Sequence, residues 1–169
     1  MGISFDPVET AEDQGYLARL ADEIWHEYWP DLIGAAQTDY MVEKFQSLEA
    51  IRRDMGENAY EYWILHGEDG RTLGFTGGHV EPETNRFFIS KVYLLKEERG
   101  KGYARQTVEF YNRLCLDRGL DAMYLTVNKG NEMGIRAYKG TGFETIEAVE
   151  TDIGEGFIMD DYVMERPAK

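Results

Sequence analysis

The sequence has few of the residues that mark several common classes of protein. Its 169 residues include one cysteine, Cys115, which excludes an internal disulfide and a metal site built from several cysteines. No apolar run approaches the roughly 18 residues that a membrane span requires. A basic segment followed by an apolar one is missing at the N-terminus, so we expect a cytoplasmic protein without a cleaved leader.

Basic residues are also scarce. The chain has 18 Lys and Arg against 32 Asp and Glu, which gives a formal net charge of −14. A surface of that sign repels nucleic acids and anionic membranes, so we expect neither as a partner. Cationic partners are favoured, although acidity that only keeps the protein soluble is the simpler explanation.

The chain is long enough for one sizeable core, and we expect a single domain over residues 1–169. Apolar residues recur every three or four positions from Leu17 to Tyr28, which predicts a helix with Thr10 as its N-cap and Pro30 as its stop. The same spacing in "TDYMVEKFQSLEAIRRDM" predicts a second helix over residues 38–55.

The hydrophobic period then changes to two, which is typical of strands. Residues 60–66, 71–80 and 86–95 are predicted as three consecutive strands, joined through "GEDG" and "PETN". A helix ending at Gly119, a strand over 122–128, a short helix over about 131–139 and a closing hairpin over 143–166 follow. With a first strand in "ISFDPVE", the order is β-α-α-β-β-β-α-β-α-β-β, which implies a mixed sheet.

The stretch "VYLLKEERGKGYA" has the features of an anion site. A helix start leaves about four backbone N–H groups unpaired and attracts phosphate. Gly100 and Gly102 leave room for close approach, while Arg99, Lys101 and Arg105 supply positive charge. A P-loop is excluded because Gly102 follows Lys101, and a dinucleotide fingerprint is excluded because Arg105 occupies the place of its third small residue.

Two motifs resemble the GNAT superfamily of acyl-CoA-dependent N-acetyltransferases. One is Arg99 to Ala104 after an apolar strand, and the other is "LTVNKGNEMGIRAYKGTGF". With the element order, the resemblance extends along essentially the whole chain. It implies an α/β (α+β) fold: a central, twisted, mostly antiparallel mixed sheet of about seven strands, with about four helices on both faces. It also implies an acyltransferase that uses acetyl-CoA without a metal, and a homodimer.

The resemblance assigns roles to individual residues. Main-chain groups at a splay or bulge would pair with the pantetheine arm, and the glycine-rich loop would hold the pyrophosphate. Asn131 matches an asparagine that reaches the cofactor, and it is an equally good helix N-cap. Tyr138 matches a tyrosine that acts as general acid beside the thioester sulfur; otherwise it is a core aromatic. The cofactor-binding set is Leu94, Leu95, Arg99, Gly100, Lys101, Gly102, Tyr103, Ala104, Asn131 and Tyr138.

The general base is harder to identify. Many family members carry a glutamate where this sequence has Ser90. Pairing the hairpin through "PETN" puts His79 and Ser90 on one face, so His79 acting through a water held by Ser90 is one candidate, unless His79 packs or faces solvent. Glu81 is a second candidate, although a residue opposite Arg86 more often makes a cross-strand ion pair.

The acceptor side is expected in the first two helices and the last hairpin. Trp25, Tyr28 and Trp29 would line an amine pocket through cation–π contacts, or belong to the core. Asp160 and Asp161 lie in an alternating strand, so at most one faces a given side, and a solvated edge is the default. The ending "GFIMDDYVMERP" resembles polyamine acetyltransferase-like members. We therefore expect an N-acetyltransferase for a small amine; the alternatives are a protein or peptide N-acetyltransferase and a non-catalytic acyl-CoA-binding module.

Overall fold

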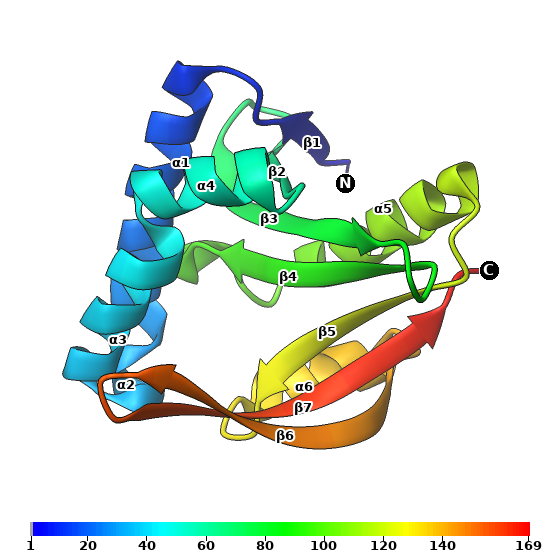
Figure 1. Cartoon of the computed structure of the whole chain (residues 1–169). Helices are drawn as coiled ribbons and strands as arrows, with labels where there is room; N and C mark the ends of the chain where they lie inside the picture. The colour runs from blue at the N-terminus through cyan, green and yellow to red at the C-terminus, as the bar shows by residue number, and fades with distance from the viewer. Residues whose placement is uncertain (1) are drawn as a thin grey trace. The chain divides into compact units, whose positions relative to one another are not determined.

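The computed structural model of the protein describes residues 2–169 (Figure 1). Seven strands form one sheet in the order β1-β2-β3-β4-β5-β7-β6. The strands are β1 (Ser4–Pro7), β2 (Glu61–His66), β3 (Thr72–Glu81), β4 (Arg86–Leu94), β5 (Ala122–Asn128), β6 (Glu144–Gly154) and β7 (Phe157–Pro167). β4 and β5 pair in parallel, whereas β1–β2, β2–β3, β5–β7 and β6–β7 are antiparallel. The expected mixed, mostly antiparallel sheet is confirmed.

The helices depart from the expectation in number. The six α-helices are α1 (Ala11–Tyr28), α2 (Pro30–Ile33), α3 (Ala35–Met41), α4 (Leu48–Glu57), α5 (Tyr103–Arg118) and α6 (Glu132–Gly140), with a π-helix at Val42–Gln46 and a 3₁₀-helix at Lys96–Glu98. About four helices were expected; the additional ones are the short helix α2, which follows the predicted stop at Pro30, and a second piece of the helix predicted over residues 38–55. None of the helices in residues 2–169 has the length and apolarity that crossing a bilayer demands.

The short helix α2 follows the predicted stop at Pro30. α1 ends at Tyr28 as predicted, but Pro30 occupies the first position of the short helix α2 instead of ending helical structure. Proline is tolerated there because the N–H that it lacks has no partner within a helix.

The helix predicted over residues 38–55 is subdivided at Ser47. Ser47 has an extended backbone (ψ 162°), and its hydroxyl accepts the Ala50 N–H at 3.2 Å, so it caps α4. The single predicted helix is therefore wrong. The apolar spacing continues through the break, which hid it in the sequence.

The chain divides into two compact units. One comprises the residues up to His79 together with Lys91–Tyr103, and the other comprises Val80–Ser90 with Ala104–Lys169. β3 and β4 contribute residues to both units. The single-domain organisation stays a prediction.

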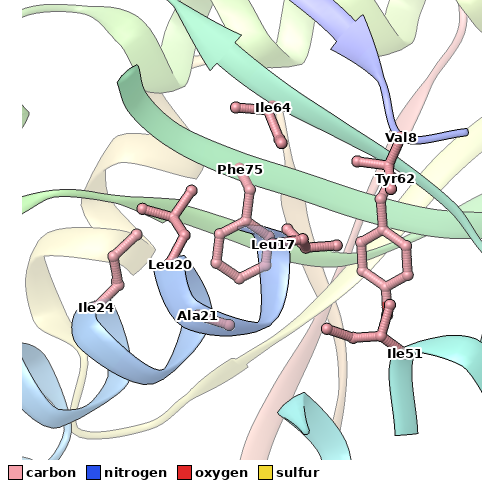
Figure 2. Packing of buried hydrophobic residues seen from close by; sticks show 9 residues of the cluster. All are labelled: Val8, Leu17, Leu20, Ala21, Ile24, Ile51, Tyr62, Ile64 and Phe75. Atoms are coloured by element: carbon pink, nitrogen blue, oxygen red, sulfur yellow. The ribbon is translucent and has the colours of Figure 1, made fainter. Parts of the chain in front are cut away.

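In the first unit, α1 and α4 pack on one face of the sheet. Figure 2 shows the α1 side chains pointing toward Phe75, and Ile51 of α4 beside Tyr62. The cluster comprises Val8, Leu17, Leu20, Ala21, Ile24, Ile51, Tyr62, Ile64 and Phe75. Each large apolar side chain buried in this way contributes about 1.5–3 kcal/mol. Thr10 caps α1 in a reciprocal capping box with Asp13, which confirms the predicted start of this helix.

The opposite face of the same sheet is covered by the first residue of α5. Tyr103 packs with Leu65 and Leu73, and all three are buried. The β2–β3 register shifts between Leu65, which pairs with Gly74, and His66, which pairs with Thr72. This bulge leaves Leu73 as an extra residue, so Leu73 and Phe75 point to opposite faces.

In the second unit, α5 packs on the sheet through Tyr111, whose ring lies 5.1 Å from that of Phe87. Cys115 is fully buried on the same helix, and burial raises the pKa of its thiol to about 11. Such a thiol is inert at neutral pH, so Cys115 is a packing residue.

Candidate active site

The glycine-rich loop lies between the end of β4 at Leu94 and the start of α5 at Tyr103. Gly100 and Gly102 both adopt left-handed backbone, with φ of 77° and 85°. A β-carbon at either position would meet no described atom within 4 Å. Glycine is therefore favoured by backbone conformation, and the turn is uncovered, as close approach of an anion to a helix start requires.

Arg99 is held in place by the end of α1. Its Nε donates to the Leu94 carbonyl at 3.2 Å, its Nη2 lies 3.6 Å from a Glu27 carboxylate oxygen, and its guanidinium lies 4.5 Å from the centre of the Tyr28 ring. Glu27 also accepts the Lys96 N–H at 2.5 Å. Burial raises the pKa of Tyr28, which remains neutral beneath the cation. Tyr28, predicted to line an amine pocket, thus contacts the anion loop.

Glu98 is a buried acid inside the loop, with 3% of its surface exposed. Its two oxygens accept from Arg71 Nη2 at 3.0 and 3.1 Å, and Lys101 Nζ donates to one of them at 3.1 Å. Burial acts to raise the pKa of Glu98, but the hydrogen bonds from Lys101 and Arg71 outweigh it and the pKa is lowered. The sequence did not reveal this anchor, because Arg71 is 27 positions away from Glu98.

The end of β4 comes unusually close to β3. A β-carbon on Gly74 would lie 2.1 Å from the Tyr93 carbonyl oxygen and 2.9 Å from the Leu94 Cα, so only glycine fits. The Leu95 N–H donates to the Leu73 carbonyl at 2.9 Å. This close approach favours the irregular backbone predicted at Leu94 and Leu95; the pairing of their main chain with a ligand stays a prediction.

The second motif forms α6. Asn131 Oδ1 accepts the Gly134 N–H at 3.0 Å, so Asn131 is the N-cap of this helix. Tyr138 lies in its last turn, half-buried, with its ring edge-on to Phe143 at 5.6 Å. The Tyr138 carbonyl accepts the N–H groups of Thr141 and Phe143, which fixes the end of the helix. The Tyr138 ring is therefore held by both packing and backbone.

The family-model comparison decides the family. The model of the acetyltransferase (GNAT) family matches residues 21–143, which include the glycine-rich loop, Asn131 and Tyr138. The chain belongs to the acetyltransferase (GNAT) family. The expected superfamily and the expectation of an acyltransferase are confirmed.

Three proteins illustrate what this GNAT protein resembles. The uncharacterized N-acetyltransferase YycN of Bacillus subtilis (strain 168) is 24% identical over 151 residues, covering 88% of this chain and 97% of YycN. The crystal structure of PaiA N-acetyltransferase from Thermoplasma acidophilum, in complex with coenzyme A, aligns with a TM-score of 0.78 and 19% identity, over 99% of both chains. Spermidine N-acetyltransferase from Vibrio cholerae, in complex with CoA and spermine, aligns with a TM-score of 0.70 and 16% identity, over 98% of this chain and 95% of that one. At these identities the two structures show the shared fold.

Glu81 of this GNAT protein is already engaged. Its carboxylate accepts from Thr84 Oγ1 at 2.5 Å, from Arg86 at 3.1 Å and from the Tyr124 hydroxyl. Hydrogen bonds from Thr84, Tyr124 and Arg86 hold the pKa of Glu81 at about 2. A carboxylate this acidic is a weak base, so the geometry favours the cross-strand pair that was the alternative.

His79 and Ser90 are the other two candidates for the base. The His79 ring lies 5.1 Å from that of Tyr60, at the end of β3. Ser90 is half-buried in β4. Their joint action on a water stays a prediction.

Trp25 of α1 and Trp29, which caps the C-terminus of α1, are buried in this GNAT protein. Trp25 and Trp29 have 3% and 9% of their surface exposed, and their rings lie 5.2 Å apart. Trp25 also contacts Tyr93 edge-on at 5.4 Å. Their burial favours the core alternative over an amine pocket.

A buried lysine, not singled out in the sequence, lies in β4. Lys91 is 5% exposed, and its Nζ donates to the Tyr62 hydroxyl at 2.8 Å and to the Phe45 carbonyl in the π-helix at 3.1 Å. Its ammonium also lies 5.6 and 5.0 Å from the ring centres of Tyr60 and Tyr62. Burial lowers the pKa of Lys91 to about 8, with Asp54 acting in the opposite direction. The hydrophobic pattern of the sequence does not indicate that a charged residue is buried at this position.

Proposed function

We propose that this GNAT protein transfers the acetyl group of acetyl-CoA to the primary amine of a small molecule. The observation that carries the proposal is the loop from Arg99 to Gly102. Two glycines in left-handed backbone leave the start of α5 uncovered, in a chain of the acetyltransferase family. The coenzyme A in the Thermoplasma acidophilum structure supports this choice of cofactor.

The residues fit the cofactor because the glycine-rich turn has no side chain over it. The loop residues Arg99 to Ala104 would hold the pyrophosphate, Leu94 and Leu95 would offer main-chain groups to the pantetheine arm, and Asn131 would add an amide. When bound, acetyl-CoA supplies an activated acetyl thioester. The chain's own residues must then orient it and manage two protons.

The first proton leaves the acceptor. An alkyl amine with a pKa near 10.4 needs about 4–5 kcal/mol to be neutral at pH 7, so a base contributes to the rate. An imidazole accepts a proton at neutral pH, whereas the Glu81 carboxylate is held by its hydrogen bonds. We therefore assign the base to His79, acting through a water held by Ser90.

The second proton goes to the departing sulfur. Tyr138 Oη would donate it as general acid. A tyrosine near pKa 10 and a thiol near 8.5 differ by about 1.5 units, or roughly 2 kcal/mol, so the transfer is feasible. Replacing Tyr138 by phenylalanine removes the hydroxyl and keeps the ring that packs against Phe143, so the variant tests the hydroxyl alone.

Polyamines are the proposed acceptor class. The net charge of −14 attracts polycations, and the Vibrio cholerae structure of the same fold contains spermine. A non-catalytic acyl-CoA-binding module is the second candidate, favoured by Ser90 at the place of the family glutamate.

The test measures thiol release from acetyl-CoA with polyamines, aminoglycosides, amino acids and short peptides. We expect release with one amine class and a loss of at least tenfold in Tyr138→Phe. Tyr16→Phe is the matched control, because it removes a surface hydroxyl that bonds to Thr72 at 2.7 Å. If no amine supports release while calorimetry detects micromolar acetyl-CoA binding, the transferase is wrong and the binding module is favoured.

A further inference from the structure

Asp161 is a buried carboxylate without a partner. It lies in β7, where 5% of its surface is exposed. Within residues 2–169, no hydrogen bond and no ion pair reaches its side chain. Its neighbour Asp160 lies on the other face of the strand and has an ion-pair partner, because Lys129 Nζ lies 2.8 Å from its buried Oδ1, although this oxygen accepts no hydrogen bond. Alternation in the sequence predicted that at most one of the two acids faces a given side; the structure identifies Asp161 as the buried one.

The two residues that pair with Asp161 across the sheet do not compensate for its charge. It pairs across the sheet with Asn128 of β5 and Val149 of β6. Asn128 Oδ1 accepts the Gly130 N–H at 2.8 Å, and Val149 has no side-chain donor. Burial raises the pKa of Asp161 to about 6; the negative charge of Asp160 adds to this and Lys129 opposes it.

An uncompensated buried carboxylate is destabilising in the free protein. Acidic side chains are rarely this buried unless a cation or several donors hold them. Val163, the next residue of β7 on the same face, is apolar and also buried, so this face of the strand is otherwise an apolar environment at that point. A buried carboxylate that destabilises the fold and has no partner in the protein points to a ligand that supplies the positive charge and the donors.

We propose that Asp161 binds an alkylammonium group of the amine acceptor, which makes it a specificity-determining residue. A primary ammonium brings one positive charge and three N–H donors, which are the two things that the carboxylate lacks. The inference rests on the proposed acetylation of a small amine, and it names the carboxylate that would select a cationic acceptor. It also separates the roles of the adjacent acids, because Asp160 already has Lys129.

The test compares wild type, Asp161→Asn and Asp160→Asn, with spermidine as the probe. Asparagine keeps the shape of the side chain and removes the charge, and Asp160→Asn removes the neighbouring charge on the other face. Calorimetry in the presence of CoA should give spermidine binding at least tenfold weaker in Asp161→Asn and within threefold of wild type in Asp160→Asn. Steady-state turnover should show the same rise in the KM for spermidine, a smaller change in kcat and an unchanged KM for acetyl-CoA.

A stability measurement guards against misfolding. Without ligand, Asp161→Asn should unfold at a Tm at least equal to that of wild type, because the variant no longer buries a charge. Spermidine should raise the Tm of wild type and of Asp160→Asn, but not that of Asp161→Asn.

Equal spermidine affinity in wild type and Asp161→Asn would overturn the inference, and so would a wild type that does not bind spermidine. These results are separable from the fate of the proposed function. If an amine supports thiol release and its KM is the same in wild type and Asp161→Asn, the proposed transferase activity holds and the role of Asp161 is wrong. If spermidine binding depends on Asp161 but no thiol is released, the role of Asp161 holds and the proposed transferase activity is wrong.

Discussion

Replacing Lys91 by methionine should change how the free energy of unfolding depends on pH. In the folded protein the pKa of Lys91 is lowered from 10.5 to about 8 by burial. Between these two values the unfolded chain holds a proton on this lysine that the folded protein does not. Stability therefore rises with pH across this window, by linkage, and is flat on either side of it.

The size of the effect follows from the two pKa values. A difference of about 2.5 units corresponds to a total rise of about 3 kcal/mol, of which about 2 kcal/mol falls between pH 7.5 and 9.5. Methionine has a similar length and no charge, so the Lys91→Met variant should lack this rise. The variant also removes the hydrogen bonds that Lys91 donates to the Phe45 carbonyl and the Tyr62 hydroxyl, which costs about 1–3 kcal/mol each at every pH.

The assay is urea unfolding of wild type and Lys91→Met at pH 7.5, 8.5 and 9.5. The informative quantity is the difference between the two proteins, because the titration of other groups cancels in it. This difference should grow by about 2 kcal/mol in favour of wild type from pH 7.5 to 9.5. Lys44→Met, on an exposed lysine, is the control and should keep the wild-type slope. A difference that stays constant with pH would refute the reasoning.

Four further substitutions, in three experiments, test other contacts. Gly74→Ala should lower the free energy of unfolding by about 1–3 kcal/mol or more, because its β-carbon would overlap the Tyr93 carbonyl; an unchanged urea midpoint would contradict this. Asn131→Ala and Ser47→Ala each remove an N-cap and should lower the free energy of unfolding by about 1 kcal/mol. Only Asn131→Ala should weaken acetyl-CoA binding in calorimetry. If both variants bind acetyl-CoA with the same affinity, the role of Asn131 is limited to capping. The pKa of His26 is raised by its hydrogen bonds to the Asp22 carbonyl and the Asp39 side chain. Protonated His26 therefore stabilises the fold fully below about pH 6.5, and this stabilisation is lost as pH rises through the folded-state pKa. His26→Gln should be more destabilising at pH 6 than at pH 8.5 in urea unfolding, and equal losses of stability at the two pH values would contradict this prediction.

The parts of the fold that the sequence predicted are those set by local chemistry. Thr10 with Asp13 defines a helix start within four residues, and Gly119, with φ of 70°, follows the last residue of α5 as expected. The loop at Gly100 and Gly102 was recognisable because its glycines and cations are contiguous.

The features that the sequence did not predict depend on contacts between residues distant in the sequence, or on which face of an element a side chain occupies. The break at Ser47 is hidden because the apolar spacing passes through it. Glu98 is buried with Arg71 as a partner, and Arg71, just before β3, is 27 positions away in the sequence. Alternation predicted that Asp160 and Asp161 point to opposite sides, but it did not tell which of them is buried.

The cations around the glycine-rich loop have a consequence for how binding responds to ionic strength. Lys101 donates a hydrogen bond to Glu98. Arg99 forms an ion pair with Glu27 and donates to the Leu94 carbonyl. Arg105 donates to the Gly140 carbonyl at 3.3 Å. Their charge is already partly compensated, so a bound anion would depend mainly on uncharged amide groups. Added salt screens charges and leaves amide hydrogen bonds largely intact. Coenzyme A should therefore remain bound as potassium chloride rises into the range that releases ligands from open clusters of lysine.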